Sequence, residues 1–175
     1  APPAKKPLFQ SASRLDTFNF CSQQYAAKYL YKIPDSGNDG SNRGNCVHDV
    51  LELLVKPRHR KHIDTILAAK TCKTNRAVWK LLLAHARKND VNDYENLDLI
   101  DSFMLIALKN EFLGPKGTSK IVGEQEFSLV VNQGGLSYAI RGYIDKTCVV
   151  KDEQGVLIIC TDYKTSKAKF SGDKL

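Results

Sequence analysis

The hydrophobic periodicity of the chain changes once, near Gly117. Upstream of this residue, apolar side chains recur at three- and four-residue spacing, which is typical of amphipathic helices. Downstream, apolar and polar residues alternate, and residues 156–160 form a continuous apolar run, which is typical of a strand buried on both faces. The sequence therefore predicts an α/β (α+β) fold, in which a helical N-terminal half packs on an antiparallel-to-mixed β-sheet core.

Turn and loop residues divide these patterns into elements. The expected helices lie at about residues 13–30, 43–56, 63–67, 78–83 and 97–108, with a polar loop at residues 35–42. The expected strands form an antiparallel meander with tight turns at residues 132–135 and 152–155, and they cover residues 127–131, 138–150 and 155–164. Because domains usually contain ~100–200 residues, the 175 residues predict one domain over residues 11–175, preceded by a flexible arm or linker at residues 1–10.

Charge and cysteine content narrow the class of protein. The chain carries 26 Lys and Arg against 19 Asp and Glu, which gives a formal net charge of +7. This charge suits a polyanionic partner, although many proteins without such a partner share it.

No apolar run approaches the ~20 residues that cross a bilayer, and the N-terminus lacks the apolar segment of a secretory signal, so we expect a cytoplasmic protein with no membrane partner. The five cysteines include no C-x-x-C pair, and we interpret them as buried reduced thiols rather than disulfides or a zinc or iron–sulfur site.

Two carboxylates and a lysine lie near the ends of the last two expected strands. Asp145 lies in the first of these strands, Asp162 follows the continuous apolar run, and Lys164 comes two residues later. If the two strands pair across their turn, Asp145 lies directly opposite Asp162, and Lys164 points to the same face as Asp162. Carboxylates brought together in this way repel each other unless a cation lies between them. The residues therefore predict either a divalent-metal site or, as the simpler interpretation, solvated charges at two strand ends.

Mg²⁺ would suit such a site, because one or two carboxylates bind it together with waters and substrate phosphate. Lys164 would then orient an attacking water and stabilise the charge that develops on phosphorus. Upstream, His48 is a single histidine on an expected helix, and taken alone it is more often structural or solvated than a metal ligand.

Four sequence motifs follow one another along the chain. Residues 11–25 match S-x-S-x-L-x-x-F-x-x-C-P-x-x-Y with Ser in place of Pro, and residues 44–52 contain a G-x-x-x-H helix that ends in Leu-Glu. Gly142-x-x-Asp145 and then Asp-Tyr-Lys at residues 162–164 complete the series. In this order, the motifs resemble the PD-(D/E)XK nuclease superfamily and its RecB-like exonuclease branch. The resemblance implies a core of the restriction-endonuclease-like type and a nuclease that acts on DNA.

The resemblance also assigns roles to individual residues. The residues that correspond to catalytic residues are Asp145, Asp162 and Lys164, and those that correspond to metal ligands are His48, Asp145 and Asp162. An imidazole beside carboxylates makes Mn²⁺ an alternative to Mg²⁺. Glu52, one helical turn after His48, and Glu124 are auxiliary candidates, and a solvated helix glutamate explains Glu52 equally well.

Two departures from the branch lead to further expectations. In the RecB-like branch, a helix with a Q-x-x-x-Y motif follows the catalytic lysine, whereas this sequence stops at Leu175. We therefore expect a C-terminally incomplete domain, with the remainder of a larger parent protein as a candidate partner. Some members of the branch hold an iron–sulfur cluster through one early cysteine and three late ones. Cys21 could be the early one, but no late trio follows, so we expect no iron–sulfur cluster in this chain.

Basic residues follow both the histidine helix and the catalytic strand, where contacts with phosphates would give affinity without reading sequence. The DNA-binding candidates are Arg58, Arg60, Lys61, Lys167 and Lys169. We expect an exonuclease that acts on the ends of single- or double-stranded DNA in recombination, repair or replication. Its expected location is the cytoplasm, either associated with the nucleoid or in a phage-infected host. The alternatives are a nuclease-fold DNA-binding module that is inactive as isolated, and an interaction domain of a larger replication or recombination protein.

Overall fold

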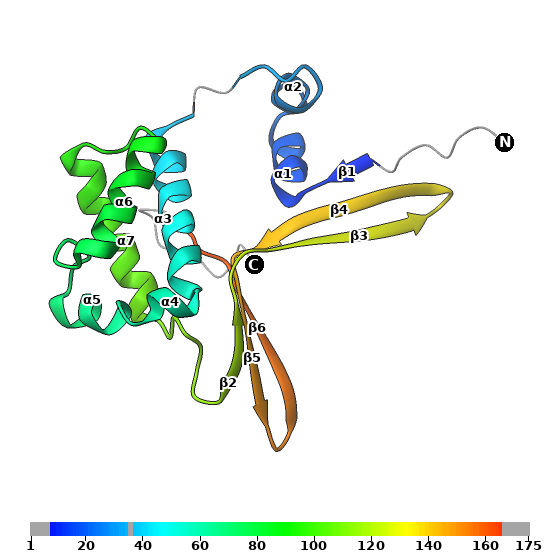
Figure 1. Cartoon of the computed structure of the whole chain (residues 1–175). Helices are drawn as coiled ribbons and strands as arrows, with labels where there is room; N and C mark the ends of the chain where they lie inside the picture. The colour runs from blue at the N-terminus through cyan, green and yellow to red at the C-terminus, as the bar shows by residue number, and fades with distance from the viewer. Residues whose placement is uncertain (1–7, 35–36, 166–175) are drawn as a thin grey trace. The chain divides into compact units, whose positions relative to one another are not determined.

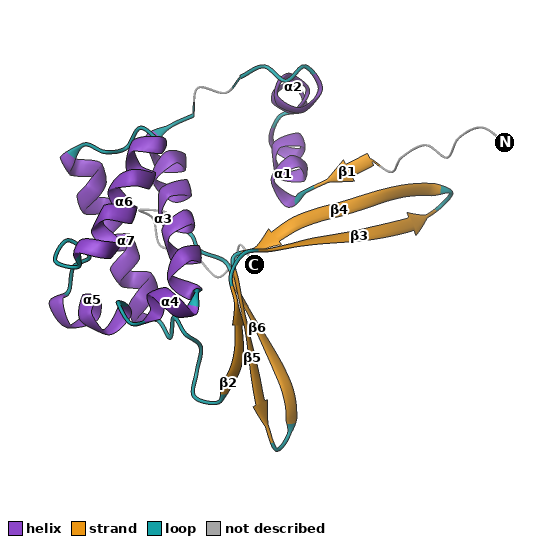
Figure 2. Cartoon of the chain, in the orientation of Figure 1, coloured by secondary structure: helices purple, strands orange, loops and turns teal. Residues whose placement is uncertain are grey.

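Helices and strands occur in both of the compact units into which the chain divides (Figure 1, Figure 2). The computed structural model describes residues 8–34 and 37–165. Unit 1 comprises residues 1–36 and 125–144, and unit 2 comprises residues 37–124 and 145–175. The predicted α/β class is confirmed, whereas a single domain over residues 11–175 stays a prediction.

Unit 1 combines short helices with a mixed sheet. Its elements are β1 (Leu8–Gln10), α1 (Ala12–Phe20), α2 (Ser22–Tyr25), the π-helix η1 (Ala26–Leu30), β3 (Gln125–Gln133) and β4 (Leu136–Ile144). In the sheet, β4 lies between β1, to which it is parallel, and β3, to which it is antiparallel. The turn that joins β3 to β4 contains Gly134 and Gly135 at positive φ (58° and 77°), within the predicted turn.

The single helix expected over residues 13–30 is wrong, because the chain leaves the helical conformation at Cys21. This residue has an extended backbone (φ −158°, ψ 110°), and its thiol accepts a hydrogen bond from the N–H of Gln24 at 3.5 Å. Cys21 therefore ends α1 and caps α2. The rings of Phe18 and Tyr25 still touch across the break, with centroids 5.3 Å apart. Because the aromatic spacing continues through the break, the periodicity of the sequence did not reveal it.

Unit 2 contains the helices predicted for the middle of the chain. They are α3 (Asp39–Val55), α4 (Pro57–Arg60), α5 (Ile63–Ala69), α6 (Arg76–Lys88) and α7 (Tyr94–Lys109). Helix α3 begins earlier than expected, because the Asn38 side chain accepts a hydrogen bond from the N–H of Ser41 at 2.9 Å. The loop expected over residues 35–42 is therefore wrong in its second half. Over the described ranges, no helix is both long and apolar enough to span a membrane.

Helix α3 is the centre of the core of unit 2. It packs against both α6 and α7. The core residues that these three helices contribute include Val47, Val50, Leu51 and Leu54 of α3, Val78 and Leu82 of α6, and Ile100 and Met104 of α7. Burying a side chain of this size stabilises the fold by about 1.5–3 kcal/mol relative to leaving it exposed. The packing fixes α3 in place, and with it the polar residues on the rest of its surface.

The sheet of unit 2 is antiparallel. Its strands are β2 (Thr118–Val122), β5 (Lys146–Asp152) and β6 (Gly155–Thr161), in the order β2-β5-β6. In the β5–β6 hairpin, Asp152 pairs with Gly155 and Lys146 pairs with Thr161. This register is the predicted one, and it places Asp145 and Asp162 at the next opposed positions, just beyond the last pair.

The expected three-stranded meander is wrong, because residues 138–150 do not form one strand. The chain bends at Asp145, so that β4 pairs with β3 in unit 1, whereas β5 pairs with β2 and β6 in unit 2. At the bend, the Asp145 carboxylate accepts the N–H of Tyr163 at 2.6 Å. The Asp145 side chain thus accepts a main-chain N–H just beyond the last pair of the β5–β6 hairpin.

The interpretation of residues 156–160 as a strand buried on both faces is also wrong for the described residues. Val156, Leu157 and Ile158 are between 57% and 63% exposed. Strand β6, which contains them, lies at the edge of its sheet. A short apolar run does not distinguish an edge strand from a central one.

The cysteines only partly follow the predicted pattern. Cys46, Cys72 and Cys148 are buried and free, as predicted, whereas Cys21 is partly exposed and Cys160 is exposed. Burial, and to a lesser degree the nearby Asp49, raises the pKa of Cys46 to about 12. This thiol therefore stays protonated near neutral pH, and a protonated thiol is a poor metal ligand.

A buried carboxylate connects α7 to the loop between α5 and α6. Asp101 is 8% exposed, and it accepts hydrogen bonds from the Thr71 hydroxyl and from the N–H of Cys72, both at 2.7 Å. The carboxylate therefore satisfies two donors of a segment that is distant in sequence.

We expect Asp101→Ala to lower the free energy of unfolding by about 2–3 kcal/mol, because the substitution leaves the buried N–H of Cys72 without its acceptor. Urea denaturation followed by circular dichroism measures this loss. The matched control is Asp98→Ala on the same helix, which removes only a half-exposed ion pair with Lys73 and should change stability by less than about 1 kcal/mol. Equal losses in the two variants would contradict the structural role of Asp101.

Candidate active site

His48 and Asp145 face each other in unit 2. His48 lies in the middle of α3, and Asp145 lies at the bend before β5. Oδ1 of Asp145 is 3.2 Å from Nδ1 of His48, and the two side chains are 12% and 32% exposed, respectively. The other carboxylate oxygen, Oδ2, accepts the N–H of Tyr163 at 2.6 Å. The Asp145 carboxylate therefore joins α3 to the segment that follows β6.

The backbone carbonyl of Tyr163 is the third member of this group. Its oxygen lies 2.9 Å from Nε2 of His48. Carbonyl and carboxylate oxygens can only accept, so a neutral His48 donates to one of its two neighbours, and only a protonated ring donates to both. Both ring nitrogens thus face oxygen atoms. The sequence pointed to the residues on either side of Tyr163, but it carries no signal for a main-chain oxygen.

Gly44 allows the segment after β6 to approach α3 closely. A Cβ atom at this position would lie 3.0 Å from Oγ1 of Thr165, which is tighter than nine in ten real Cβ contacts. Gly44 lies one helical turn before His48 and therefore on the same face of α3. The absence of a side chain at Gly44 thus makes room for residues 162–165 beside the histidine.

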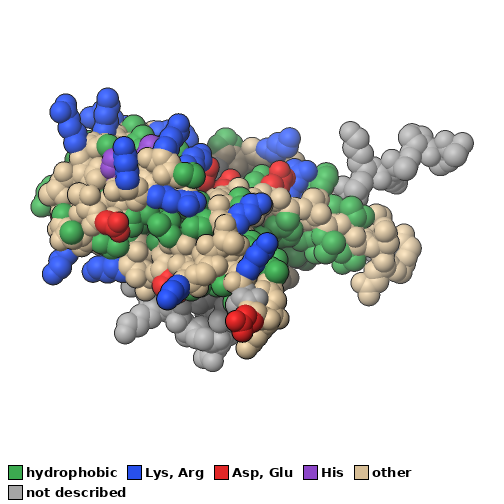
Figure 3. Space-filling model, turned by 60° about the horizontal axis from the view of Figure 1, so that its bottom comes forward, with side chains coloured by type: hydrophobic (Ala, Val, Ile, Leu, Met, Phe, Trp, Pro, Cys, Tyr) green, Lys and Arg blue, Asp and Glu red, His purple; other side chains and the backbone are tan. Residues whose placement is uncertain are grey.

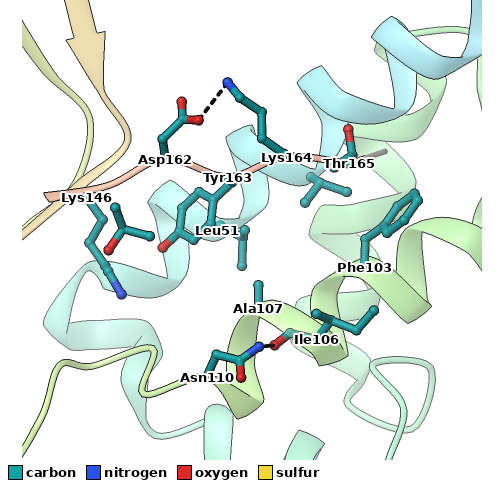
Figure 4. Close-up of a pocket in the computed structure, with 12 residues that line it drawn as sticks. Leu51, Phe103, Ile106, Ala107, Asn110, Lys146, Asp162, Tyr163, Lys164 and Thr165 are labelled. Carbon is teal, nitrogen blue, oxygen red and sulfur yellow. Dashed lines mark hydrogen bonds and ion pairs between the residues drawn. The ribbon is translucent and has the colours of Figure 1, made fainter. Parts of the chain in front are cut away.

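Asp162 and Lys164 follow β6 directly. Nζ of Lys164 lies 2.7 Å from Oδ2 of Asp162, and the side chains are 57% and 60% exposed, respectively. Figure 4 shows both side chains on one side of the segment, pointing toward each other. The ion pair confirms that the two residues share a face.

The structure brings His48 to Asp145 but leaves Asp162 paired with Lys164. Within residues 8–34 and 37–165, no three side chains of His, Cys, Asp or Glu surround one metal position. The opposed backbone positions of Asp145 and Asp162 therefore do not by themselves bring both carboxylates to the imidazole.

The other side of the segment is buried. Tyr163 and Lys146 line a pocket of about 320 Å³, which α3 and α7 also border (Figure 4). Lys146 is only 4% exposed, and its Nζ donates to the backbone carbonyl of Phe112 at 2.9 Å. The same Nζ lies 5.3 Å from the centre of the Phe112 ring. Burial lowers the pKa of Lys146, and burial together with the nearby Asp145 raises the pKa of Tyr163. Lys146 was not among the residues predicted from the sequence. Its hydrogen bond to Phe112 fixes the start of β5 beside the site.

The two auxiliary candidates lie in different surroundings. Glu52 forms an ion pair with Lys56, one turn further along α3, at 3.0 Å, and both side chains are more than 40% exposed. Glu124 lines a second, polar pocket together with His48. The structure thus places Glu124 in a space that the histidine also borders, whereas Glu52 is engaged by its helical neighbour.

Three of the five DNA-binding candidates lie within the residues that the structure describes. Arg58 and Lys61 are exposed, and Arg60 donates from Nε to a carbonyl at the end of α3 at 2.8 Å. Figure 3 shows Lys and Arg side chains projecting from the helical part of the surface, at the left of the view. Lys167 and Lys169 lie outside the described residues.

The donor atoms in this part of unit 2 are of the types that a hard divalent cation takes. The imidazole of His48 lies between a carboxylate oxygen of Asp145 at Nδ1 and the carbonyl oxygen of Tyr163 at Nε2, and the carboxylate of Asp162 lies on the residue next to that carbonyl. Oxygen ligands suit Mg²⁺, and the imidazole also suits Mn²⁺. A cation at these donors, with an exposed lysine close by in the chain, would favour reactions in which an anionic ester is attacked by water.

Comparison with known families agrees with this chemistry. The family model of the PD-(D/E)XK nuclease superfamily matches residues 10–174. The matched range includes every site residue discussed above, from His48 to Lys164. No curated protein matches the chain.

The close approach at Gly44 predicts an unusual response to alanine. Gly→Ala in a helix interior normally stabilises by about 1 kcal/mol. We expect Gly44→Ala to give no such gain, because the new methyl group meets Oγ1 of Thr165, and we expect Thr165→Ala in the same chain to restore the gain. A double-mutant cycle in urea denaturation measures the coupling. A full stabilisation by Gly44→Ala alone would contradict the tight contact.

The two contacts of Asp145 predict different outcomes for two substitutions. Asp145→Asn keeps an oxygen that can accept the N–H of Tyr163 but loses the charge. We expect this variant to unfold within about 1 kcal/mol of the wild type, and Asp145→Ala to lose about 1–3 kcal/mol. Both should weaken Mn²⁺ binding in a calorimetric titration by at least about 10-fold. Undiminished Mn²⁺ binding by Asp145→Asn would show that the carboxylate is not a ligand.

Proposed function

Because the chain belongs to the PD-(D/E)XK nuclease superfamily, we propose that it is a divalent-metal-dependent deoxyribonuclease that hydrolyses phosphodiester bonds. Membership itself supports metal-dependent nuclease activity. The observation that carries the proposal is that His48 contacts both Asp145 and the carbonyl of Tyr163, directly beside the exposed pair of Asp162 and Lys164.

In this proposal, His48, Asp145 and Asp162 would hold Mg²⁺ or Mn²⁺. When bound, the cation neutralises charge on the phosphate and favours the deprotonation of water. Asp145 keeps the imidazole of His48 oriented, because it contacts Nδ1 and is itself held by the N–H of Tyr163. The fold thus fixes the positions of two of the three proposed ligands, His48 and Asp145, relative to each other.

Lys164 is the proposed partner of the attacking water. Its ammonium group is exposed and is held by Asp162 at 2.7 Å, so it stays near the donors without being buried among them. A preplaced cation of this kind orients the nucleophile and stabilises the negative charge that grows on the phosphate in the transition state. If Asp162 held a cation instead of Lys164, the ammonium group would be available to the substrate.

The finer assignment is an exonuclease of the RecB-like branch that acts on DNA ends in recombination, repair or replication. The order of the four motifs supports this assignment, and the net charge of +7 supports a polyanionic substrate. Cleavage assays with linear DNA and with covalently closed circles test it. An exonuclease degrades only the linear form, whereas cutting of intact circles would show an endonuclease.

The alternative is a nuclease-fold module that binds DNA or another protein without cleaving DNA. One observation favours it, namely that no three metal-ligating side chains surround one position among the described residues. A calorimetric Mn²⁺ titration distinguishes the two, because a binding module without a metal site shows no carboxylate-dependent uptake of Mn²⁺.

We expect Asp162→Ala and Lys164→Ala each to lower kcat for the cleavage of linear DNA by about 100-fold or more. Each substitution removes a group that acts in the transition state. Both side chains are more than half exposed, so each substitution should change the free energy of unfolding by less than about 1 kcal/mol. Timed digestion of labelled DNA and urea denaturation measure the two effects.

Asp98→Ala is the matched control for these variants, because it also removes an aspartate that is paired with a lysine on the surface. It should cleave DNA at the wild-type rate. If purified Asp162→Ala or Lys164→Ala also cleaves at the wild-type rate, the proposed active site is wrong.

A further inference from the structure

A polar pocket of about 360 Å³ opens between α3 and the C-terminal end of α6. His48 and Glu124 line it, together with Asp49 and Lys88. The proposed function uses His48 from this pocket and leaves the ammonium group of Lys88 without a role.

Contacts between α3 and α6 hold Lys88 in this pocket. Lys88 is the last residue of α6, and its Nζ lies 3.5 Å from Oδ2 of Asp49, the residue directly after His48. The same oxygen lies 2.8 Å from Nδ1 of His85, which is one turn earlier on α6. His85 thus fixes the position of Asp49, and Asp49 in turn orients Lys88.

The requirements of folding do not explain this arrangement. The side chain of Lys88 is 71% exposed, and that of Asp49 is 35% exposed. An ion pair at this exposure contributes only about 0–1 kcal/mol to stability. The pair therefore adds little to the packing of α6 on α3, which the apolar core already secures.

A phosphate binds in this pocket only if cations offset the negative charges that line it. Asp49 and Glu124 both carry carboxylates, which repel an anion that enters the pocket. A divalent ion bound at His48 would attract the anion from one side. Lys88 supplies the attraction on the side formed by α6.

We propose that Lys88 binds a backbone phosphate of the DNA strand adjacent to the bond that is cleaved, an inference that rests on the proposed nuclease function. Lysine binds phosphate as a point charge, and such contacts position a strand without reading its sequence. The contact exists before the reaction begins. Lys88 therefore contributes to binding of DNA rather than to the chemical step.

The test compares Lys88→Met with Lys88→Arg and with Lys80→Met in the full chain. Lys80 is an exposed lysine of the same helix that does not line the pocket, so its loss changes the net charge equally. Fluorescence anisotropy with labelled DNA of mixed sequence gives the Kd and its salt dependence, with Mn²⁺ present and every protein carrying Lys164→Ala, which is expected to prevent cleavage. Initial rates with Mn²⁺ give KM and kcat.

We expect Lys88→Met to weaken DNA binding about 3–10-fold and to reduce the slope of log K against log salt by about 0.7–0.9, the loss of one phosphate contact. KM should rise while kcat stays within about 2-fold of the wild type. Lys88→Arg and Lys80→Met should keep the wild-type slope. Because Lys88 is exposed, the thermal unfolding of Lys88→Met should match that of the wild type, and Lys88→Gln provides a second variant if it does not.

Several outcomes would overturn the inference. They are an equal loss of slope in Lys88→Met and Lys80→Met, an unchanged slope in Lys88→Met, and undetectable DNA binding by the wild type. If the wild type binds DNA in a manner that depends on Lys88 but does not cleave it, the phosphate contact is supported and the proposed nuclease function is contradicted. The two hypotheses therefore fail in different ways.

Discussion

The carboxylate of Asp145 is the interaction on which the candidate site depends. One of its oxygens accepts the N–H of Tyr163 and the other contacts His48, so a single side chain connects the end of one hairpin strand, the bend before the other and the middle of α3. A hydrogen bond to a charged acceptor is worth about 1.5–3 kcal/mol, and a partly buried one holds its geometry better than an exposed ion pair. The bend at Asp145 and the orientation of the histidine therefore depend on the two oxygens of the same carboxylate.

Contacts on both sides of the segment after β6 reinforce the role of Asp145. On the side of α3, Gly44 leaves room for Thr165. On the other side, Lys146 is buried and its ammonium group donates to the carbonyl of Phe112. A buried lysine is costly unless its charge is hydrogen-bonded, so its position admits little variation. The segment lies between a helix that allows it to approach and a buried anchor that supports it.

The sequence predicted the parts of this site that follow from local patterns. The turn at residues 152–155 determines the β5–β6 register, and this register places Asp145 opposite Asp162. The bend at Asp145 was not predicted, because it depends on an N–H donor from a distant segment. The burial of β6 was predicted wrongly, because an apolar run does not show whether a neighbouring strand is present. The contribution of Tyr163 could not be predicted from its side chain, since its main-chain atoms make the contacts with Asp145 and His48.

The two carboxylates of the proposed metal site have unequal structural roles. Asp145 is 12% exposed and bound to the backbone, whereas Asp162 is 60% exposed and paired with the ammonium group of Lys164. The first carboxylate is therefore preorganised by the fold, and the second is free to change partner when a cation or a phosphate arrives. Such a division lets the fold hold part of the ligand set rigidly while the exposed ion pair limits charge repulsion at the site. It also means that stability and metal binding are coupled at Asp145 and nearly independent at Asp162.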